Sequence, residues 1–489
     1  MSGLEETLDP QDWEALRALS HRIIDEAIEY TRDVRDRPLW QAMPKEVREV
    51  LNSPLPQDPK PLDEVYDLLS KNVMAYPMGN THPRFWMWYM GSSNFTGALG
   101  DFLAAVQGSN LGGGNHAASL VDQQVVDWCK QMLGFPETAS GTLVSGGSMA
   151  NIIGLTVARN QMADADVRTE GVGALDRPLR FYGSDQLHSC HQIAVESLGL
   201  GSKSLRKIRS HPDCTIDIES LKFAITEDRA AGFNPACVIA TAGTVNTGAI
   251  DDLQAIKALC QRENMWFHVD GCIGALIAIA PGNKSRVSGI ELADSIALDP
   301  HKWLHAPFEV GCALIRDRDA HYGAFTLTPE FLEMTERGIA SAHWLHDFGL
   351  QTSRGFRALK VWMALQEHGV QKFGRLIDQN IAQAHYLSEL ICKTAGLELT
   401  METSINIVCY RFDPGQTSEE DLKRINTEIM LQMQETGVAA ISDTTVHGRH
   451  CLRAAINNHR TVATDLAFLV SETLRLGNAI VNASSLFSH

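Results

Sequence analysis

A series of short apolar runs that alternate with stretches of helical period limits the possible folds of this chain more than any other feature. The runs begin near residues 179, 206, 237, 265, 294 and 310. Strands that are joined by helices usually pair in parallel, and the helices then cover both faces of the sheet. The sequence therefore predicts an α/β fold in which a mainly parallel sheet forms a large domain.

Two polar segments stand where neighbouring strands of this sheet should end. His268-Val269-Asp270 closes one apolar run, and Asp299-Pro300-His301-Lys302-Trp303 follows another at residues 295–298. Open α/β sheets bind ligands at the carboxyl ends of their strands, so we expect Asp270 and Lys302 to face one crevice. On spacing alone, a structural ion pair explains the two residues equally well.

These two segments resemble the pyridoxal 5'-phosphate (PLP) site of the group II decarboxylases, the family of aromatic L-amino-acid decarboxylase. The resemblance implies that Lys302 carries the cofactor as a Schiff base, flanked by Asp299 and His301, and that Asp270 pairs with the pyridine nitrogen. A carboxylate there favours the protonated ring, which can hold the electron pair released at Cα. We expect burial and a nearby cation to lower the pKa of Lys302, so that its amine can attack an aldehyde.

A glycine-serine turn at residues 145–148 is a candidate phosphate site. It follows an apolar run and opens a helical pattern. Free N–H groups at such a helix start can bind an anion, although an ordinary helix cap also explains the turn. The turn has the family's position in the chain, and the resemblance makes Gly147 and Ser148 cofactor-binding residues. Thr241 matches the first threonine of the family's Ala-Thr-Leu-Gly-Thr, which lies near the cofactor.

A histidine motif follows the strand predicted at residue 179. Residues 184–190, Ser-Asp-Gln-Leu-His-Ser-Cys, resemble the family's Ser-Asp-Gln-Ala-His-Ser-Ser. The histidine of that motif stacks on the cofactor ring and contacts the substrate carboxylate, and the resemblance gives this role to His188. His191 has no counterpart with a role in the family, and we expect it to be simply packed or exposed.

An aromatic segment at residues 81–95 resembles the substrate mouth of the family. The resemblance places Trp88 and Tyr89 beside the substrate side chain, and Gly91 where animal enzymes carry a threonine that helps to bind the substrate carboxylate. An ordinary aromatic core cluster is the alternative. In the relatives, the part of the chain that corresponds to the glycine-rich loop at 107–115 reaches the neighbouring subunit's active site, so Asn110 of this loop is also a predicted substrate-binding residue.

Phe331 is the most informative departure from the family. The animal enzymes place a catalytic tyrosine there, which returns a proton to Cα after CO2 has left, and phenylalanine has no hydroxyl for this task. A carbanion that lives longer can react with O2, and the resulting imine hydrolyses to an aldehyde and ammonia with release of peroxide. Several family members with this replacement are aldehyde synthases. Alternatively, Phe331 only packs the loop, and His188 or water donates the proton.

The resemblance covers nearly the whole chain and implies the fold type I architecture of PLP enzymes. Residues 1–85 are predicted to form a helical N-terminal dimerisation segment, residues 86–378 the large PLP-binding domain, and residues 379–489 a small α+β domain. The apolar stripe of the N-terminal helix must pack either on its own domain or on a second subunit. In the family this arm clasps the second protomer of a homodimer whose active sites lie at the subunit interface. The small domain shows no obvious catalytic set.

Composition narrows the function further. A net charge of −17 and a pI near 5.5 argue against nucleic acid or an anionic membrane as partners. We see no signal peptide and no membrane span, and the ten cysteines lack any zinc spacing, so we expect reduced thiols, no metal site and a cytoplasmic protein.

The predicted function is PLP-dependent decarboxylation of an L-amino acid, coupled to its oxidative deamination. The predicted substrate is an aromatic or natural-product-derived amino acid. Simple decarboxylation to an amine, β-elimination from a cysteine conjugate, and a binding module without catalysis are the alternatives.

Overall fold

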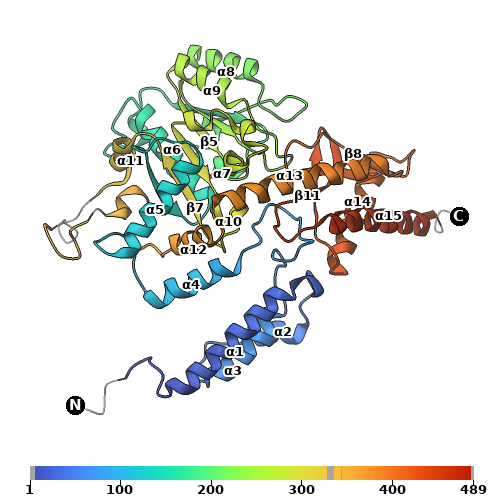
Figure 1. Cartoon of the computed structure of the whole chain (residues 1–489). Coiled ribbons are helices and arrows are strands. Elements are labelled where there is room, and N and C mark those ends of the chain that lie inside the picture. Colours follow the sequence, from blue (N-terminus) through green and yellow to red (C-terminus); the bar gives the residue numbers. More distant parts are fainter. Residues whose placement is uncertain (1–5, 328–334, 343, 486–489) are drawn as a thin grey trace.

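The computed structural model describes residues 6–327, 335–342 and 344–485. Figure 1 shows a helical N-terminal arm that lies apart from an α/β body, with a smaller unit at the C-terminal end of the chain. Among the helices of the described ranges, none combines the length and hydropathy that a membrane crossing requires.

The N-terminal arm consists of α1 (Trp13–Arg32), α2 (Lys45–Leu51) and α3 (Leu62–Leu69). The α1 helix begins where the Asp12 carboxylate accepts hydrogen bonds from two backbone N–H groups of the first turn. An ion pair of 2.7 Å between Arg22 and Asp67 joins α1 to α3. Neither α1 nor α3 has a single buried residue in this chain. The apolar stripe predicted for the arm is therefore left uncovered by its own body.

The main sheet confirms the predicted α/β fold. Its seven strands have the order β1-β7-β6-β5-β4-β2-β3, and all neighbours pair in parallel except β7, which is antiparallel to β1 and to β6. The bounds are β1 (Ser140–Val144), β2 (Leu179–Ser184), β3 (Leu205–Ile208), β4 (Asn234–Thr241), β5 (Trp266–Asp270), β6 (Ser295–Leu298) and β7 (Gly311–Ile315). The predicted strand starts fall within three residues of these.

Helices cover both faces of this sheet because side chains alternate along the central strands. In β4, Val238 and Ala240 join the hydrophobic cluster that includes side chains of α8 and α9, whereas Cys237 and Ile239 join the cluster with α6 and α7. The helices of the body are α4 (Phe95–Gln107), α5 (Ala117–Met132), α6 (Gly147–Met162), α7 (Cys190–Ser197), α8 (Ile218–Ala230), α9 (Leu253–Glu263), α10 (Pro300–Trp303), α11 (Arg318–Phe325) and α12 (Ala358–His368).

The C-terminal unit packs three helices on a four-stranded antiparallel sheet of order β10-β11-β9-β8. Its elements are α13 (Val370–Lys393), β8 (Leu397–Leu399), β9 (Ile407–Phe412), α14 (Glu419–Glu435), β10 (Ser442–Val446), β11 (Arg449–Ala455) and α15 (Ala463–Ser485). The predicted boundary between residues 378 and 379 falls inside α13. The first half of this helix contributes Phe373 and Ile377 to the main core, and the second half contributes Leu387 and Ile391 to the small one.

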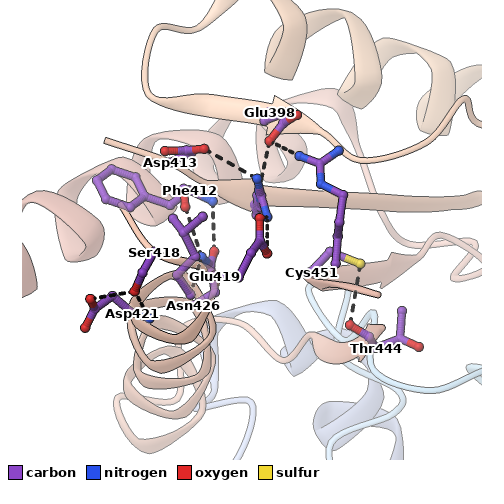
Figure 2. Close-up of polar contacts among 12 residues, drawn as sticks. Glu398, Phe412, Asp413, Ser418, Glu419, Asp421, Asn426, Thr444 and Cys451 are labelled. Atoms are coloured by element: carbon purple, nitrogen blue, oxygen red, sulfur yellow. Dashed lines mark hydrogen bonds and ion pairs between the residues drawn. The ribbon is translucent and has the colours of Figure 1, made fainter. Parts of the chain in front are cut away.

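Polar contacts fix α14 and β9 in the small unit, as Figure 2 shows. The amide of Asn426 accepts a hydrogen bond from the N–H of Phe412 (2.8 Å) and donates one to its carbonyl (2.9 Å). The nearly buried Arg411 pairs with Glu398 (2.8 Å) and Glu419 (2.9 Å). Strand β9 pairs in turn with β11, which brings a residue to the site described below.

Candidate functional site

A cavity of about 640 Å³ opens at the carboxyl ends of the parallel strands. It brings together ten residues that the sequence predicted for the site, although they come from six separate segments of the chain. These are Trp88, Tyr89, Gly147, Ser148, His188, Thr241, Asp270, Asp299, His301 and Lys302. Gly91 and Asn110 do not line the cavity, and Phe331 lies outside the described residues. The roles of these residues remain predictions, but most of them share one space.

Lys302 reaches the cavity from the short helix α10, which begins at Pro300. Its Nζ lies 2.9 Å from Asp299 Oδ2. The expected fall in the pKa of Lys302 is wrong for the protein alone. Burial by itself would lower that pKa, but the attraction of Asp299, followed by Cys272 and Asp270, raises it above its usual value. The expectation supposed a neighbouring cation, and the chain instead surrounds the amine with acidic groups.

Asp270 ends β5, and both of its carboxylate oxygens have donors. Oδ2 lies 2.8 Å from His191 Nε2, and Oδ1 accepts a hydrogen bond from the N–H of Cys272 at 3.1 Å. Burial would raise the pKa of Asp270, but the hydrogen bond and attraction of His191, with smaller effects of Cys272 and Lys302, lower it below its usual value. The carboxylate is thus held ionised against a buried imidazole.

His191, which we expected to be simply packed or exposed, is packed, and it also contacts the carboxylate of Asp270. The sequence carried one usable signal: His191 lies about one helical turn beyond His188, at the start of a helix that begins beside the cavity. His188 itself points its Nδ1 toward the N–H of Cys190, from which it accepts a hydrogen bond of 3.1 Å. Burial lowers the pKa of His188, so its ring is uncharged at neutral pH and can stack on a flat cofactor.

The start of α6 lies where the sequence predicts an anion cradle. Gly146 precedes the helix with φ of +158°, and as the N-cap residue it has no side chain that could bond to the first N–H groups. A Cβ on Gly147 would lie 2.4 Å from Cys272 Sγ and 2.7 Å from Asp299 Oδ2, so only glycine fits there. Free N–H groups at a helix start favour a phosphate. The hydroxyl of Thr241 is also buried with no hydrogen-bond partner among the described residues.

This donor set fits PLP. The cofactor needs an amine for its aldehyde, a carboxylate for its pyridine nitrogen and backbone N–H groups for its phosphate. Lys302, Asp270 and the turn at Gly147 supply these three around one cavity. The orphaned hydroxyl of Thr241 and the equally orphaned Oδ1 of Asp299 are polar atoms that a bound ligand could satisfy.

Arg453 is a site residue that the sequence did not reveal, because the small domain showed no catalytic pattern. It comes from β11 and lines the cavity. Its guanidinium donates to the carbonyls of Trp88 (2.7 Å), Asn246 (3.0 Å) and Val245 and to the Ser442 hydroxyl (3.3 Å). No carboxylate of the described residues pairs with it. A positive charge therefore lines the cavity without a carboxylate partner in the described part of the chain.

Two residues that the sequence predicts to bind substrate, Gly91 and Asn110, lie outside the lining of the cavity and make other contacts. A Cβ on Gly91 would lie 1.8 Å from the carbonyl oxygen of His301, so this glycine is a close backbone contact. A threonine, as the animal enzymes carry, would displace the lysine segment here. The Asn110 side chain accepts hydrogen bonds from the N–H groups of Gly112 (2.9 Å) and Arg354 (3.0 Å) and holds the glycine-rich loop. Their substrate-binding roles remain predictions.

The aromatic pair at the mouth divides between core and cavity. Tyr89 is buried, meets Trp303 edge to face and accepts a hydrogen bond from Asn406 at 2.9 Å. Trp88 is 47% exposed, with φ of +53°. The alternative of an aromatic core cluster therefore applies in part to Tyr89, whereas the exposed side chain of Trp88 can contact a ligand.

Comparisons with known proteins identify relatives that are similar to this chain in sequence and in fold. The family model of the pyridoxal-dependent decarboxylase conserved domain matches residues 44–413. The aromatic-L-amino-acid decarboxylase of Bacillus atrophaeus is 31% identical over 476 residues, which cover 96% of each chain. The phenylacetaldehyde synthase of Arabidopsis thaliana is 28% identical over 471 residues, covering 93% of this chain and 94% of the relative. The solved structure of Oryza sativa TDC with PLP and tryptamine has a TM-score of 0.89 and 26% identity, and covers 97% of this chain and 100% of that one.

Proposed function

This chain belongs to the pyridoxal-dependent decarboxylase family, and on that premise we propose that it decarboxylates an aromatic L-amino acid and passes the electrons to O2. The balanced reaction consumes one amino acid, one O2 and one water. It yields an aldehyde, CO2, ammonia and hydrogen peroxide. Phe331, at the position of the family's catalytic tyrosine, carries this proposal.

PLP, the cofactor of the family, supplies a conjugated ring that takes up the electron pair left at Cα when CO2 departs. Lys302 would hold the cofactor aldehyde, Asp270 the ring nitrogen, and the N–H groups after Gly146 the phosphate. The uncharged ring of His188 would cover one face of the cofactor. Arg453, which has no carboxylate partner among the described residues, would attract the substrate carboxylate by its charge and its one remaining N–H group, which favours binding of the acid over the product.

Phe331 offers no hydroxyl, so its side chain cannot return a proton to Cα after CO2 loss. A slow protonation leaves more time for O2 to take the electrons. The Arabidopsis relative named phenylacetaldehyde synthase supports this outcome, while the Bacillus relative is named a decarboxylase. Simple decarboxylation, with His188 or water as the proton donor, is therefore the second candidate, since His188 lines the cavity.

Product analysis tests the proposal. The PLP-loaded enzyme is incubated with a panel of L-amino acids, and CO2, aldehyde, amine, ammonia, peroxide and O2 uptake are measured together. We expect aldehyde, ammonia and peroxide in equal amounts with an aromatic substrate. The matched variant Phe331→Tyr should shift the product toward the amine and reduce O2 uptake. An amine formed by the wild type without O2 uptake refutes the oxidative proposal, and thiol release without CO2 would indicate elimination instead.

We also propose that the active enzyme is a homodimer joined through the N-terminal arm. Four apolar side chains of α1 and α3 support this, because Trp13, Leu62, Val65 and Leu69 are 60%, 54%, 44% and 41% exposed in the single chain. Exposed apolar patches of this kind mark interaction surfaces. Light scattering coupled to gel filtration should give twice the mass of one chain, and a monomeric active enzyme would refute the assignment.

The cytoplasm is the compartment that we propose. All ten cysteines are free thiols, and nine of them are buried. Disulfides are rare where thiols are kept reduced. Cell fractionation tests this, since recovery of the protein outside the cytoplasmic fraction would contradict it.

A further inference from the structure

The imidazole of His191 is fully buried, yet it is polar and contacts the carboxylate of the cofactor site. It has no exposed surface, its Nε2 lies 2.8 Å from Asp270 Oδ2, and its Nδ1 has no partner among the described residues. Buried polar groups are costly unless they are hydrogen-bonded. The contact with Asp270 is thus the hydrogen bond that explains a histidine at this place.

The geometry fixes which nitrogen of His191 carries a proton. An ionised carboxylate can only accept hydrogen bonds, so Nε2 must be the donor to Asp270. His268, two residues before Asp270 on β5, cannot take over this task. Its Nδ1 is bonded to Ser295 Oγ and its Nε2 to Asn151 Oδ1, both at 2.7 Å, and burial lowers its pKa to about 3.

His268 instead supports the ring of His191. The two rings meet nearly edge to face, with centroids 6.4 Å apart and an interplanar angle of 71°. Because both nitrogens of His268 are held, this neighbour is rigid and limits rotation of the His191 ring. His191 is therefore fixed from one side by packing and from the other by Asp270.

We propose that His191 is a positioning residue of the cofactor site, which keeps the Asp270 carboxylate ionised and turned so that it can pair with the pyridine nitrogen of PLP. Donors on both carboxylate oxygens stabilise the ionised form and prevent its rotation. This inference rests on the proposed function, because it requires the cofactor nitrogen to meet Asp270.

The helical turn from His188 to His191 would then position two groups that act on the cofactor. The N–H of His191 donates to the carbonyl of His188 at 3.2 Å, so both histidines move with the start of α7. His188 lines the cavity where it would cover the ring face, and His191 acts on the ring nitrogen through Asp270. A residue without a hydrogen-bond donor at position 191 would keep the contact of His188 with the ring face and lose the effect on the ring nitrogen.

The test measures the cofactor directly. Apoenzyme is titrated with PLP to obtain the Kd, and the ring nitrogen of 15N-labelled PLP is observed by NMR. His191→Leu should raise the Kd about 10-fold, the lower end of the effect seen when the hydrogen-bond partner of a metal ligand is lost. It should also move the 15N resonance toward that of an unprotonated pyridine.

Two further variants make the result specific. His191→Gln keeps a donor near the position of Nε2 and should restore the Kd to within about threefold of the wild type, a difference of less than 1 kcal/mol. His321→Gln removes another fully buried imidazole, which is bonded to Ser140 and to the carbonyl of Phe348, away from the cavity. This control should leave both the Kd and the 15N shift unchanged.

Asp270→Asn separates the inference from the function on which it rests. If Asp270→Asn shifts the 15N resonance and His191→Leu does not, the positioning role of His191 is overturned while the cofactor placement stands. If neither variant shifts it, the proposed placement itself fails. Should His191→Leu not fold, as circular dichroism would reveal, the Gln variant decides: an unprotonated 15N shift with Gln would also overturn the role.

Discussion

Gly147→Ala should abolish most PLP binding because the added methyl group has no room. It would lie 2.4 Å from Cys272 Sγ and 2.7 Å from Asp299 Oδ2, whereas ordinary van der Waals contacts begin at 3.4 Å. Asp299 is held by Lys302, and Cys272 is buried, so neither neighbour moves away easily. The start of α6 must therefore shift by about 1 Å.

This shift would break a hydrogen bond from a backbone N–H to the charged phosphate, which contributes about 1.5–3 kcal/mol. We therefore expect the Kd for PLP to rise about 100-fold, or about 2.7 kcal/mol. Titration of apoenzyme with PLP, followed by absorbance, measures this. Gly173→Ala is the matched control, because a Cβ on Gly173 meets nothing within 4 Å. Adding Cys272→Ala to the Gly147 variant removes the closer clash and should restore part of the affinity.

The reasoning is refuted if Gly147→Ala binds PLP within about threefold of the wild type, since that is less than 1 kcal/mol. A loss of affinity in Gly173→Ala as large as in Gly147→Ala would also refute it, because the effect would then not come from the clash. Thermal unfolding of each apoenzyme must accompany the titration, so that a folding defect is recognised.

Three other perturbations test separate parts of the structure. Gly91→Ala would place a Cβ 1.8 Å from the carbonyl oxygen of His301 and should displace the lysine segment, seen as loss of both PLP binding and activity; an active variant would contradict this close contact. Arg453→Met should raise the substrate KM about 10-fold, since a hydrogen bond to a charged group contributes about 1.5–3 kcal/mol, while the Kd for PLP changes little; equal loss of both would indicate a structural role only. Arg411→Met should lower the free energy of unfolding by about 1–2 kcal/mol, less than for a fully buried pair because its carboxylate partners are partly exposed. Burial would raise the pKa of Glu398, but its arginine partners lower it below its usual value. The difference in the free energy of unfolding between wild type and Arg411→Met should therefore be complete above pH 4.5 and shrink as the pH falls further. A difference that persists unchanged in acid would contradict this origin.

The strand ends and the cavity were predictable because the underlying signals are local. Apolar runs bounded by polar residues mark buried strands, and parallel strands place their carboxyl ends at one edge. Asp270 and Lys302 follow two such runs, β5 and β6, which are neighbours in the sheet. To predict that both side chains reach one cavity, it was therefore enough to expect these two strands to be neighbours, as in the family that the sequence resembles.

The features that escaped prediction depend on contacts between distant parts of the chain. The position of His191 depends on how α7 packs against β5, and that of Arg453 on how the small sheet meets the large one. The pKa of Lys302 depends on its distance from Asp299, which spacing in the sequence does not give. Periodicity and motifs carry no information on such distances.

Helix α13 runs without a break from one hydrophobic core into the other. The two cores therefore cannot melt one after the other unless this helix frays in its middle, and calorimetry should record a single heat-absorption peak. Saturation with PLP, whose predicted ligands lie mainly in the large core, should then slow proteolysis of the small unit as well.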